Sequence, residues 1–324
     1  MPTDMTRRER VLAAVSGGPV DRAPFSFWYH FRLEDPAGSS LASAELNFFR
    51  RFQPDFLKVM HDIPYQLPSG VAVLESPSDW AKLSVLDPYK GNFGRQLDAL
   101  AQILKGLGDD PPPVIDTVFN VFAQAEKISG KKTLQHLQED PEPVLQGLSV
   151  IADSLAAYAQ ACVETGLSGI FLAVGGASYS IMSEEEYATT FLPLDRKVLD
   201  GIKNRAVFNV VHIHGENIMF DLVSKLPCNA LSWSDRASGP PLSEGKKRFA
   251  GGVIGGINEQ KCAEQTIEEF ISDVRDALAQ TSGRRFLLGP GCAVPTPKTE
   301  AEFEMWDKRI SAALRELESF DYQW

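Results

Sequence analysis

Short apolar runs rich in β-branched residues alternate along this chain with stretches of helical periodicity, and this alternation constrains the fold more than any other feature. Eight runs have the length and composition of buried strands, at residues 25–30, 56–61, 114–119, 169–174, 207–214, 230–234, 252–257 and 286–288. Between them, residues 143–164 and 266–280 carry apolar side chains every three or four positions, as helices do. Because strands that alternate with helices form parallel sheets, the sequence predicts an α/β protein, a single (β/α)8 TIM barrel over residues 1–324.

Length, charge and cysteine usage narrow the class of protein. The chain has 324 residues, which suits one barrel domain, and its 43 acidic against 32 basic residues give a net charge of −11. That charge argues against nucleic acid or an anionic membrane as a partner. No apolar stretch approaches the roughly 18 to 20 residues that span a bilayer, no export signal opens the chain, and the four cysteines form no CxxC pair. We therefore expect a cytoplasmic protein that acts on a small molecule.

Polar residues at strand ends are the candidates for chemistry, because the active site of an α/β barrel lies at the carboxyl ends of its strands. Four of the five histidines fall at such positions, and acidic residues follow or lie within several of the same runs. The side chains expected to contact a substrate are Trp28, Tyr29, His30, His61 and Asn258. Those expected to orient groups or transfer protons are Asp62, Asp116, Glu216 and Asp235. Any one of them, taken alone, is equally well explained as a polar residue bonded to neighbouring backbone.

A metal site is the sharpest prediction from spacing. His212 and His214 are two residues apart on one predicted strand, and Cys292 follows a Gly-Pro-Gly turn after another. Residues i and i+2 of a strand point to the same face, so both imidazoles face one cavity. Catalytic zinc normally has three protein ligands, and imidazole and thiolate are among those it favours. We predict a zinc site of His212, His214 and Cys292, or of a subset that His30 or Asp235 completes. The competing interpretation places His212 in the core, with Cys292 filling space.

Several segments, spread over nearly the whole chain, resemble the uroporphyrinogen decarboxylase superfamily. They are RRERVLAA at 7–14, PVDRAP at 19–24, DFLKV at 55–59, FLP at 191–193 and GIN at 256–258. The resemblance implies a (β/α)8 barrel and a cytoplasmic enzyme. Enzymes that decarboxylate uroporphyrinogen carry an arginine-rich RQAGRY segment after the first strand, whose guanidinium groups hold the carboxylates of the substrate. Here residues 25–36 read FSFWYHFRLEDP, with only Arg32, so we do not expect that activity.

Another branch of the superfamily is similar at the predicted metal site. The corrinoid-linked methyltransferases carry His-x-Cys at the end of the fifth strand and a second Cys in a Pro-Gly-Cys turn after the eighth. His212 and Cys292 match these positions, whereas His214 stands where that branch has Cys. Imidazole in place of thiolate leaves a bound zinc less negative and more Lewis acidic.

The leading hypothesis is a zinc-dependent methyl- or alkyl-group transferase in which Asp235, Glu216 or Asp116 orients a group or accepts a proton. Because the chain lacks the DxHxxG signature of a cobalamin-binding domain, we expect the corrinoid on a separate protein. One alternative is a metal-free decarboxylase of a carboxylated aromatic or pyrrole, in which Asp62 or Asp116 stabilises a protonated ring. The other is a non-catalytic barrel that binds a tetrapyrrole or a corrinoid.

Overall fold

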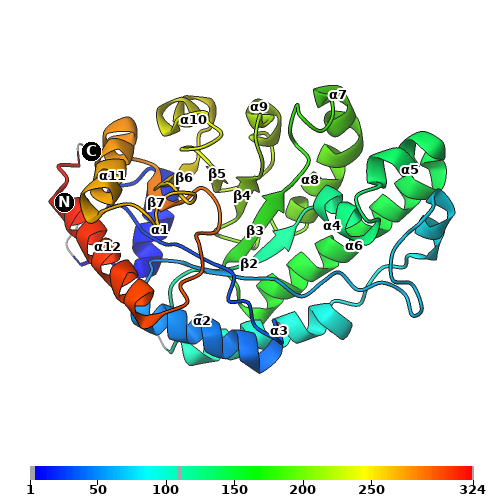
Figure 1. Cartoon of the computed structure of the whole chain (residues 1–324), viewed down its shortest axis with the longest axis horizontal. Helices are drawn as coiled ribbons and strands as arrows, with labels where there is room; N and C mark the ends of the chain where they lie inside the picture. The colour runs from blue at the N-terminus through cyan, green and yellow to red at the C-terminus, as the bar shows by residue number, and fades with distance from the viewer. Residues whose placement is uncertain (1–3, 109–110, 323–324) are drawn as a thin grey trace.

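Seven parallel strands lie at the centre of the molecule and helices surround them (Figure 1). This computed structural model describes residues 4–108 and 111–322, so residues 1–3, 109–110 and 323–324 of the predicted domain lie outside it. Each strand of the sheet pairs with the next strand along the chain. The prediction of an α/β architecture with a parallel sheet is confirmed.

The strands and helices have the following bounds. The strands are β1 (Leu57–Val59), β2 (Val114–Phe119), β3 (Gly169–Val174), β4 (Val210–Ile213), β5 (Ala230–Trp233), β6 (Gly252–Ile257) and β7 (Phe286–Pro290). The longer helices are α1 (Arg7–Ser16), α2 (Gly38–Phe52), α3 (Gly91–Gly106), α4 (Val121–Ile128), α6 (Pro141–Thr165), α8 (Leu192–Asp200), α11 (Ile267–Thr281) and α12 (Glu300–Ser319). The shorter ones are η1 (Pro77–Lys82), α5 (Thr133–Glu139), α7 (Glu184–Glu186), η2 (Tyr187–Phe191), α9 (Phe220–Val223) and α10 (Leu242–Arg248). Within the described ranges, no helix has both the length and the hydrophobicity that crossing a membrane requires.

The first of the eight predicted strands, residues 25–30, does not form a strand. Only Phe25 makes a parallel bridge, to Leu288 of β7. Further along, the carbonyl groups of Trp28 and His30 accept hydrogen bonds from the backbone of Val294 and the hydroxyl of Thr296. These donors lie beyond the end of β7, so the segment leaves the ladder after its first residue and follows an irregular part of the chain instead.

Helix boundaries follow capping signals in the sequence. The predicted helices at 143–164 and 266–280 form α6 and α11. The side chain of Thr266 accepts the N–H of Glu269, whose carboxylate accepts the N–H of Thr266, so two unpaired donors of the first turn of α11 are satisfied. A reciprocal pair of the same kind, Ser183 and Glu186, is present at the start of α7. Helix α6 ends at Gly166 with φ of 112°, a left-handed conformation that glycine adopts without steric cost.

Side chains of each strand alternate between two sides of the sheet, and both sides are buried. All six residues of β3 and all six of β6 are buried, because helices cover the outer side while other side chains fill the inner side. Lys58 of β1, Thr117 of β2, Phe171 of β3 and His212 of β4 line a pocket on the inner side. This alternation decides which polar residues of the strands are available to a ligand.

The buried Glu45 of α2 links stability to pH. Its carboxylate accepts the backbone N–H of Met60 at 2.8 Å, and burial raises the pKa of Glu45 from 4.5 to about 8 against the opposing effect of that hydrogen bond. The folded chain therefore keeps a proton that the unfolded chain releases, so this contribution to stability is present below pH 4.5 and is lost as the pH rises through about 8.

We expect the Glu45→Gln variant, which keeps the hydrogen-bond acceptor but does not titrate, to lose less free energy of unfolding than the wild type between about pH 5 and 8. Urea unfolding across that range measures the difference. Equal losses in the two proteins would contradict the assignment.

Candidate metal centre

His212, His214 and Cys292 converge at the carboxyl ends of β4 and β7. His212 lies within β4, His214 directly follows it, and Cys292 lies two residues beyond β7. Their ligand atoms all lie within 4.8 Å of one another. Because the strands are parallel, β4 and β7 end at the same side of the sheet and bring these residues together without an unusual chain path.

The turn that carries Cys292 requires glycine at position 291. A Cβ on Gly291 would lie 2.5 Å from the Cα of Ser234 and 2.9 Å from the backbone oxygen of Trp233. No side chain fits that close to two backbone atoms, so glycine alone lets the turn approach the end of β5. Glycine at position 291 of the Gly-Pro-Gly turn therefore has a steric reason, and the turn that it permits places the thiol of Cys292 at the ends of β4 and β7.

Electrostatics favour the ligand forms of all three residues. Burial lowers the pKa of His212 and of His214, so both imidazoles are neutral near pH 7, the form that binds metals. Burial opposes ionisation of Cys292, but the neighbouring imidazole of His212, the N–H of Ala293 and the charge of Lys58 bring the pKa of this thiol below its usual value. The site thus holds two neutral imidazoles beside a thiol that ionises readily.

The residues present fit a zinc ion. Nε2 of His212 is buried without a hydrogen-bond partner, while Nδ1 lies 3.3 Å from the hydroxyl oxygen of Ser232. A buried imidazole nitrogen left unpaired is costly unless a ligand satisfies it. Sγ of Cys292 is 3.9 Å from Nδ1 of His214, near the separation of about 3.6 Å that tetrahedral zinc imposes on a nitrogen and a sulfur ligand. Two imidazoles and a thiolate form a ligand set that suits zinc.

A pocket of about 280 Å³ opens beside these three residues. It is lined by Trp28, His30, Lys58, Met60, Thr117, Phe119, Ala123, Lys127, Phe171, Ala173, Gly175, His212, His214, Cys292 and Ala293. Most of the lining is apolar, and within residues 4–108 and 111–322 no aspartate or glutamate belongs to it. The pocket can therefore hold a small molecule with an apolar body in contact with the three candidate ligands.

Two of the predicted substrate-contacting residues line this pocket. Trp28 is buried in its wall, and His30 is half-exposed at its rim. Nδ1 of His30 pairs with a carboxylate oxygen of Asp62 at 2.8 Å. Burial opposes ionisation of Asp62, but its contact with His30 outweighs that effect and lowers the pKa of the carboxyl group. Asp62 therefore contacts His30 at the rim and does not itself line the pocket.

Three predicted site residues point away from the pocket. Nδ1 of His61 lies 3.0 Å from the carboxylate of Asp116, which also accepts the hydroxyl of Tyr158 of α6 at 2.7 Å. This pair fills the layer between the sheet and the outer helices. Tyr29 packs its ring against Phe48 of α2. His61, Asp116 and Tyr29 alternate with the inward-facing Met60, Thr117 and Trp28, so each belongs to the outer face.

Asp235, Asn258 and Glu216 also lie outside the pocket lining. The carboxylate of Asp235 accepts the backbone N–H of Gly256 at 3.1 Å, and burial raises the pKa of Asp235 to about 6. The side chain of Asn258 accepts backbone N–H groups of the turn that follows it. Glu216 is exposed. Asp235 and Asn258 therefore stabilise the backbone at strand ends, a role that their position in the sequence does not distinguish from catalysis.

Lys58 and Lys127 line the pocket, and the sequence reading missed both. Lys58 is a single charged residue in the middle of the apolar run at 56–61, and a charge at that position is unusual for a strand buried on both sides. That signal marks Lys58 as unusual, but it does not show which face of the sheet the side chain meets. Lys127 lies in α4 and carries no comparable signal, because lysine is common on exposed helix faces.

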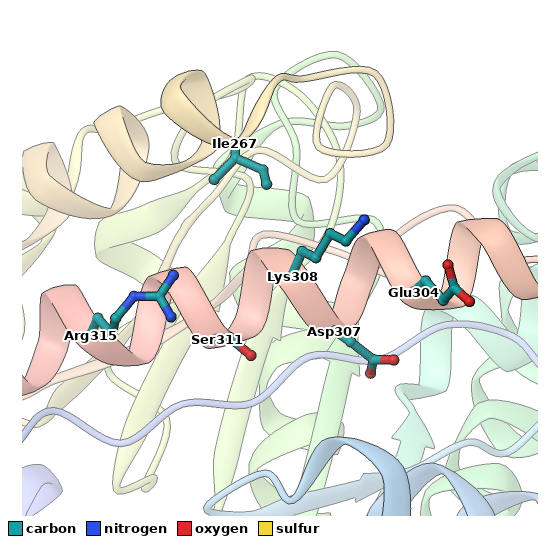
Figure 2. A pocket seen from close by; sticks show the side chains of 6 residues that line it. All are labelled: Ile267, Glu304, Asp307, Lys308, Ser311 and Arg315. Atoms are coloured by element: carbon teal, nitrogen blue, oxygen red, sulfur yellow. The ribbon is translucent and has the colours of Figure 1, made fainter.

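A hollow on the outer surface along α12 lies apart from these residues. Figure 2 shows Glu304, Asp307, Lys308 and Arg315 projecting from successive turns of α12, with Ile267 of α11 facing them. Among the described residues, its lining has no histidine, cysteine or aromatic ring. The arrangement is that of a solvated helix face, unlike the pocket beside His212.

Comparison with known proteins shows the family to which the chain belongs. The family model described as uroporphyrinogen decarboxylase (URO-D) matches residues 42–307. Methylcobamide:CoM methyltransferase MtbA of Methanosarcina mazei is 32% identical over 269 residues, 72% of this chain and 78% of that protein. Its counterpart in Methanosarcina acetivorans is 24% identical over 241 residues, 74% of this chain and 70% of that protein. A solved methyltransferase structure from Methanosarcina mazei has the same fold, with a TM-score of 0.79 over 97% of this chain and 99% of that chain at 18% identity. The chain belongs to the uroporphyrinogen decarboxylase family.

Proposed function

We propose that this protein is a zinc-dependent methyltransferase that moves a methyl group from a methylated corrinoid, carried by a separate protein, to a small thiol. The observation that carries the proposal is the convergence of His212, His214 and Cys292, whose ligand atoms lie within 4.8 Å at one end of an apolar pocket. The names of the similar proteins support the reaction class, since methylcobamide and CoM are the donor and acceptor that they state.

His212, His214 and Cys292 hold the metal in this proposal. When bound, zinc supplies a Lewis acid that lowers the pKa of an acceptor thiol, so that the thiolate exists near neutral pH. His30 lines the same pocket, and with Nδ1 paired to Asp62 its second nitrogen is left to accept the proton of the thiol. The sulfur then forms a bond to the methyl carbon while the carbon–cobalt bond of the donor breaks, and the electron pair of that bond stays on cobalt.

The apolar lining has a role in the same reaction. Trp28, Phe119 and Phe171 exclude water from the space next to Cys292. The thiolate of the acceptor therefore loses the hydration that would weaken it as a nucleophile. The pocket needs an opening on one side only, because the methyl donor is carried to it by a separate protein.

We also propose that the backbone bonds of residues 24–26 to Leu288 and Asp55 close the seven strands into an eight-membered TIM barrel, and that this one domain works in the cytoplasm.

Methyl transfer from free methylcobalamin tests the proposal. We expect zinc-loaded protein to demethylate methylcobalamin in the presence of 3-mercaptopropionate, and zinc-free protein to be inactive. The reaction is monitored by the change in the visible absorbance of methylcobalamin. Zinc content is measured on the same sample. Protein that carries one zinc ion and transfers no methyl group to any thiol, even with a corrinoid protein as donor, would overturn the function.

The decarboxylase alternative has less support from the geometry. It relied on Asp62 or Asp116 to stabilise a protonated ring, yet Asp116 faces the outer helices and Asp62 is paired with His30. No carboxylate of the part of the chain that the structure describes lines the pocket. Assay of uroporphyrinogen decarboxylation on the same protein provides the comparison, and we expect no turnover.

A further inference from the structure

Positive charge gathers in the pocket beside the candidate metal centre, although the protein as a whole is acidic. Lys58 lies in its wall and Lys127 at its rim, and among the described residues no aspartate or glutamate joins them in the lining, since Asp62 lies behind His30. The chain carries a net charge of −11, so a pocket with two lysines and no acid is the reverse of its average surface. Such a local reversal is the arrangement expected where an anion binds.

Lys58 is buried without a carboxylate partner. The residue is 6% exposed, and among the ion pairs of the described residues none involves it. Nζ donates to the thioether sulfur of Met60 at 3.1 Å and lies 5.6 and 5.0 Å from the ring centroids of Trp28 and Phe171. A thioether is a weak acceptor, so the remaining N–H groups of this ammonium are available to a ligand. Keeping a cation in such a wall is costly unless something compensates it.

Lys127 extends the same surface to the mouth of the pocket. Nζ lies 3.4 Å from the ring centroid of Phe119, which fixes the ammonium over a residue of the pocket wall. No ion pair is recorded for Lys127 in the part of the chain that the structure covers. The two lysines therefore lie along one wall, one deep and one at the entrance.

The candidate metal site adds to this positive charge and does not cancel it. A zinc ion held by one thiolate and two neutral imidazoles keeps one positive charge, and Lys58 adds a second. A thiol with an uncharged head group supplies one negative charge once its sulfur is ionised. A thiol that also bears a carboxylate or sulfonate supplies two, which matches the buried charge of the site.

We propose that Lys58 determines specificity by binding an anionic head group of the acceptor thiol, with Lys127 strengthening the contact at the pocket entrance. This inference rests on the proposed function, because it assigns a chemical class to the thiol that receives the methyl group. It predicts that acceptors are selected by charge at the end remote from sulfur, and that the apolar rings around Lys58 make this selection strong by excluding water.

A charge series of small thiols tests the selection by direct binding. Isothermal titration of zinc-loaded protein with 3-mercaptopropionate, 2-mercaptoethanesulfonate, 2-mercaptoethanol and cysteamine compares two anionic, one neutral and one cationic head group. We expect the better of the two anionic thiols to bind at least about tenfold more tightly than 2-mercaptoethanol, with cysteamine weakest, since hydrogen bonds to charged groups are the strong ones. The two anionic arms separate a carboxylate site from a sulfonate site. Equal affinity across the series would overturn the proposal.

Variants assign the effect to the lysines. In Lys58→Met the affinity ratio of anionic to neutral thiol is expected to fall by about tenfold to a hundredfold, and in Lys127→Met by a smaller factor. Lys105→Met, at an exposed position in the last turn of α3, changes the net charge equally and should leave the ratio unchanged. An unchanged ratio in Lys58→Met would also overturn the proposal. If that variant does not fold, the wild-type series and Lys127→Met decide.

Measuring thiol binding and methyl transfer on the same protein distinguishes the role of Lys58 from the proposed function. Binding of anionic thiols that depends on Lys58, without methyl transfer, would support the head-group site and refute the methyltransferase. Methyl transfer that proceeds equally well to anionic and neutral thiols would support the methyltransferase and refute the role of Lys58.

Discussion

The Cys292→Ala variant is expected to purify without stoichiometric zinc while keeping the fold of the wild type. Removing a residue that hydrogen-bonds to a metal ligand lowers metal affinity by about tenfold to a hundredfold. Removing Cys292, the thiolate ligand of the proposed site, should therefore lower zinc affinity by more than about a hundredfold. The fold should survive because Cys292 lies on a turn beyond β7 and contributes little to the core. Competition with a chromophoric chelator measures the affinity, and circular dichroism checks the fold.

Two matched variants make this result specific. Cys228→Ala removes a thiol outside the cluster and should leave zinc content unchanged. His214→Cys exchanges one ligand for another that zinc accepts, so affinity should be preserved or increased. Zinc that remains at full occupancy in Cys292→Ala, or is lost equally in Cys228→Ala, would show that the three residues do not form the site.

The Asp55→Ala variant should lose about 3 to 5 kcal/mol of stability, the usual cost of removing one partner from a buried ion pair. The carboxylate of Asp55 is fully buried and accepts hydrogen bonds from Arg10 at 2.7 Å, from Arg22 at 2.6 Å and from the backbone N–H of Phe25 at 2.8 Å. It therefore ties α1 and the segment before residue 25 to the start of β1. Removal leaves two guanidinium groups without their shared acceptor.

Asp307→Ala provides the comparison for this loss. Asp307 pairs with Arg51 on the surface at 2.8 Å, and exposed pairs contribute about 0 to 1 kcal/mol. Chemical unfolding of both variants measures the two free energies. Because Asp55 precedes β1, at the side of the sheet opposite the candidate metal centre, folded Asp55→Ala should still bind zinc. A loss below about 1 kcal/mol in Asp55→Ala would contradict the role of this network.

Local sequence was sufficient to predict the parts of this protein that depend on neighbouring residues. Seven of the eight apolar runs form strands, and the helices at 143–164 and 266–280 form α6 and α11, because periodicity and capping are properties of short segments. The shared direction of His212 and His214 follows from the two-residue repeat of a strand. Their meeting with Cys292 follows from the rule that parallel strands end on one side.

Tertiary structure alone decided which face of each strand meets the pocket. In a sheet buried on both sides, inner and outer residues are equally apolar, so no alternation in the sequence shows that Asp116 faces helices and Lys58 faces the pocket. The same ambiguity made Tyr29 resemble a residue of the cavity wall. Residues 25–30 have the composition of a strand, but a strand also needs a partner ladder. That ladder is absent after Phe25 because the chain beyond β7 takes an irregular path, which no short segment encodes.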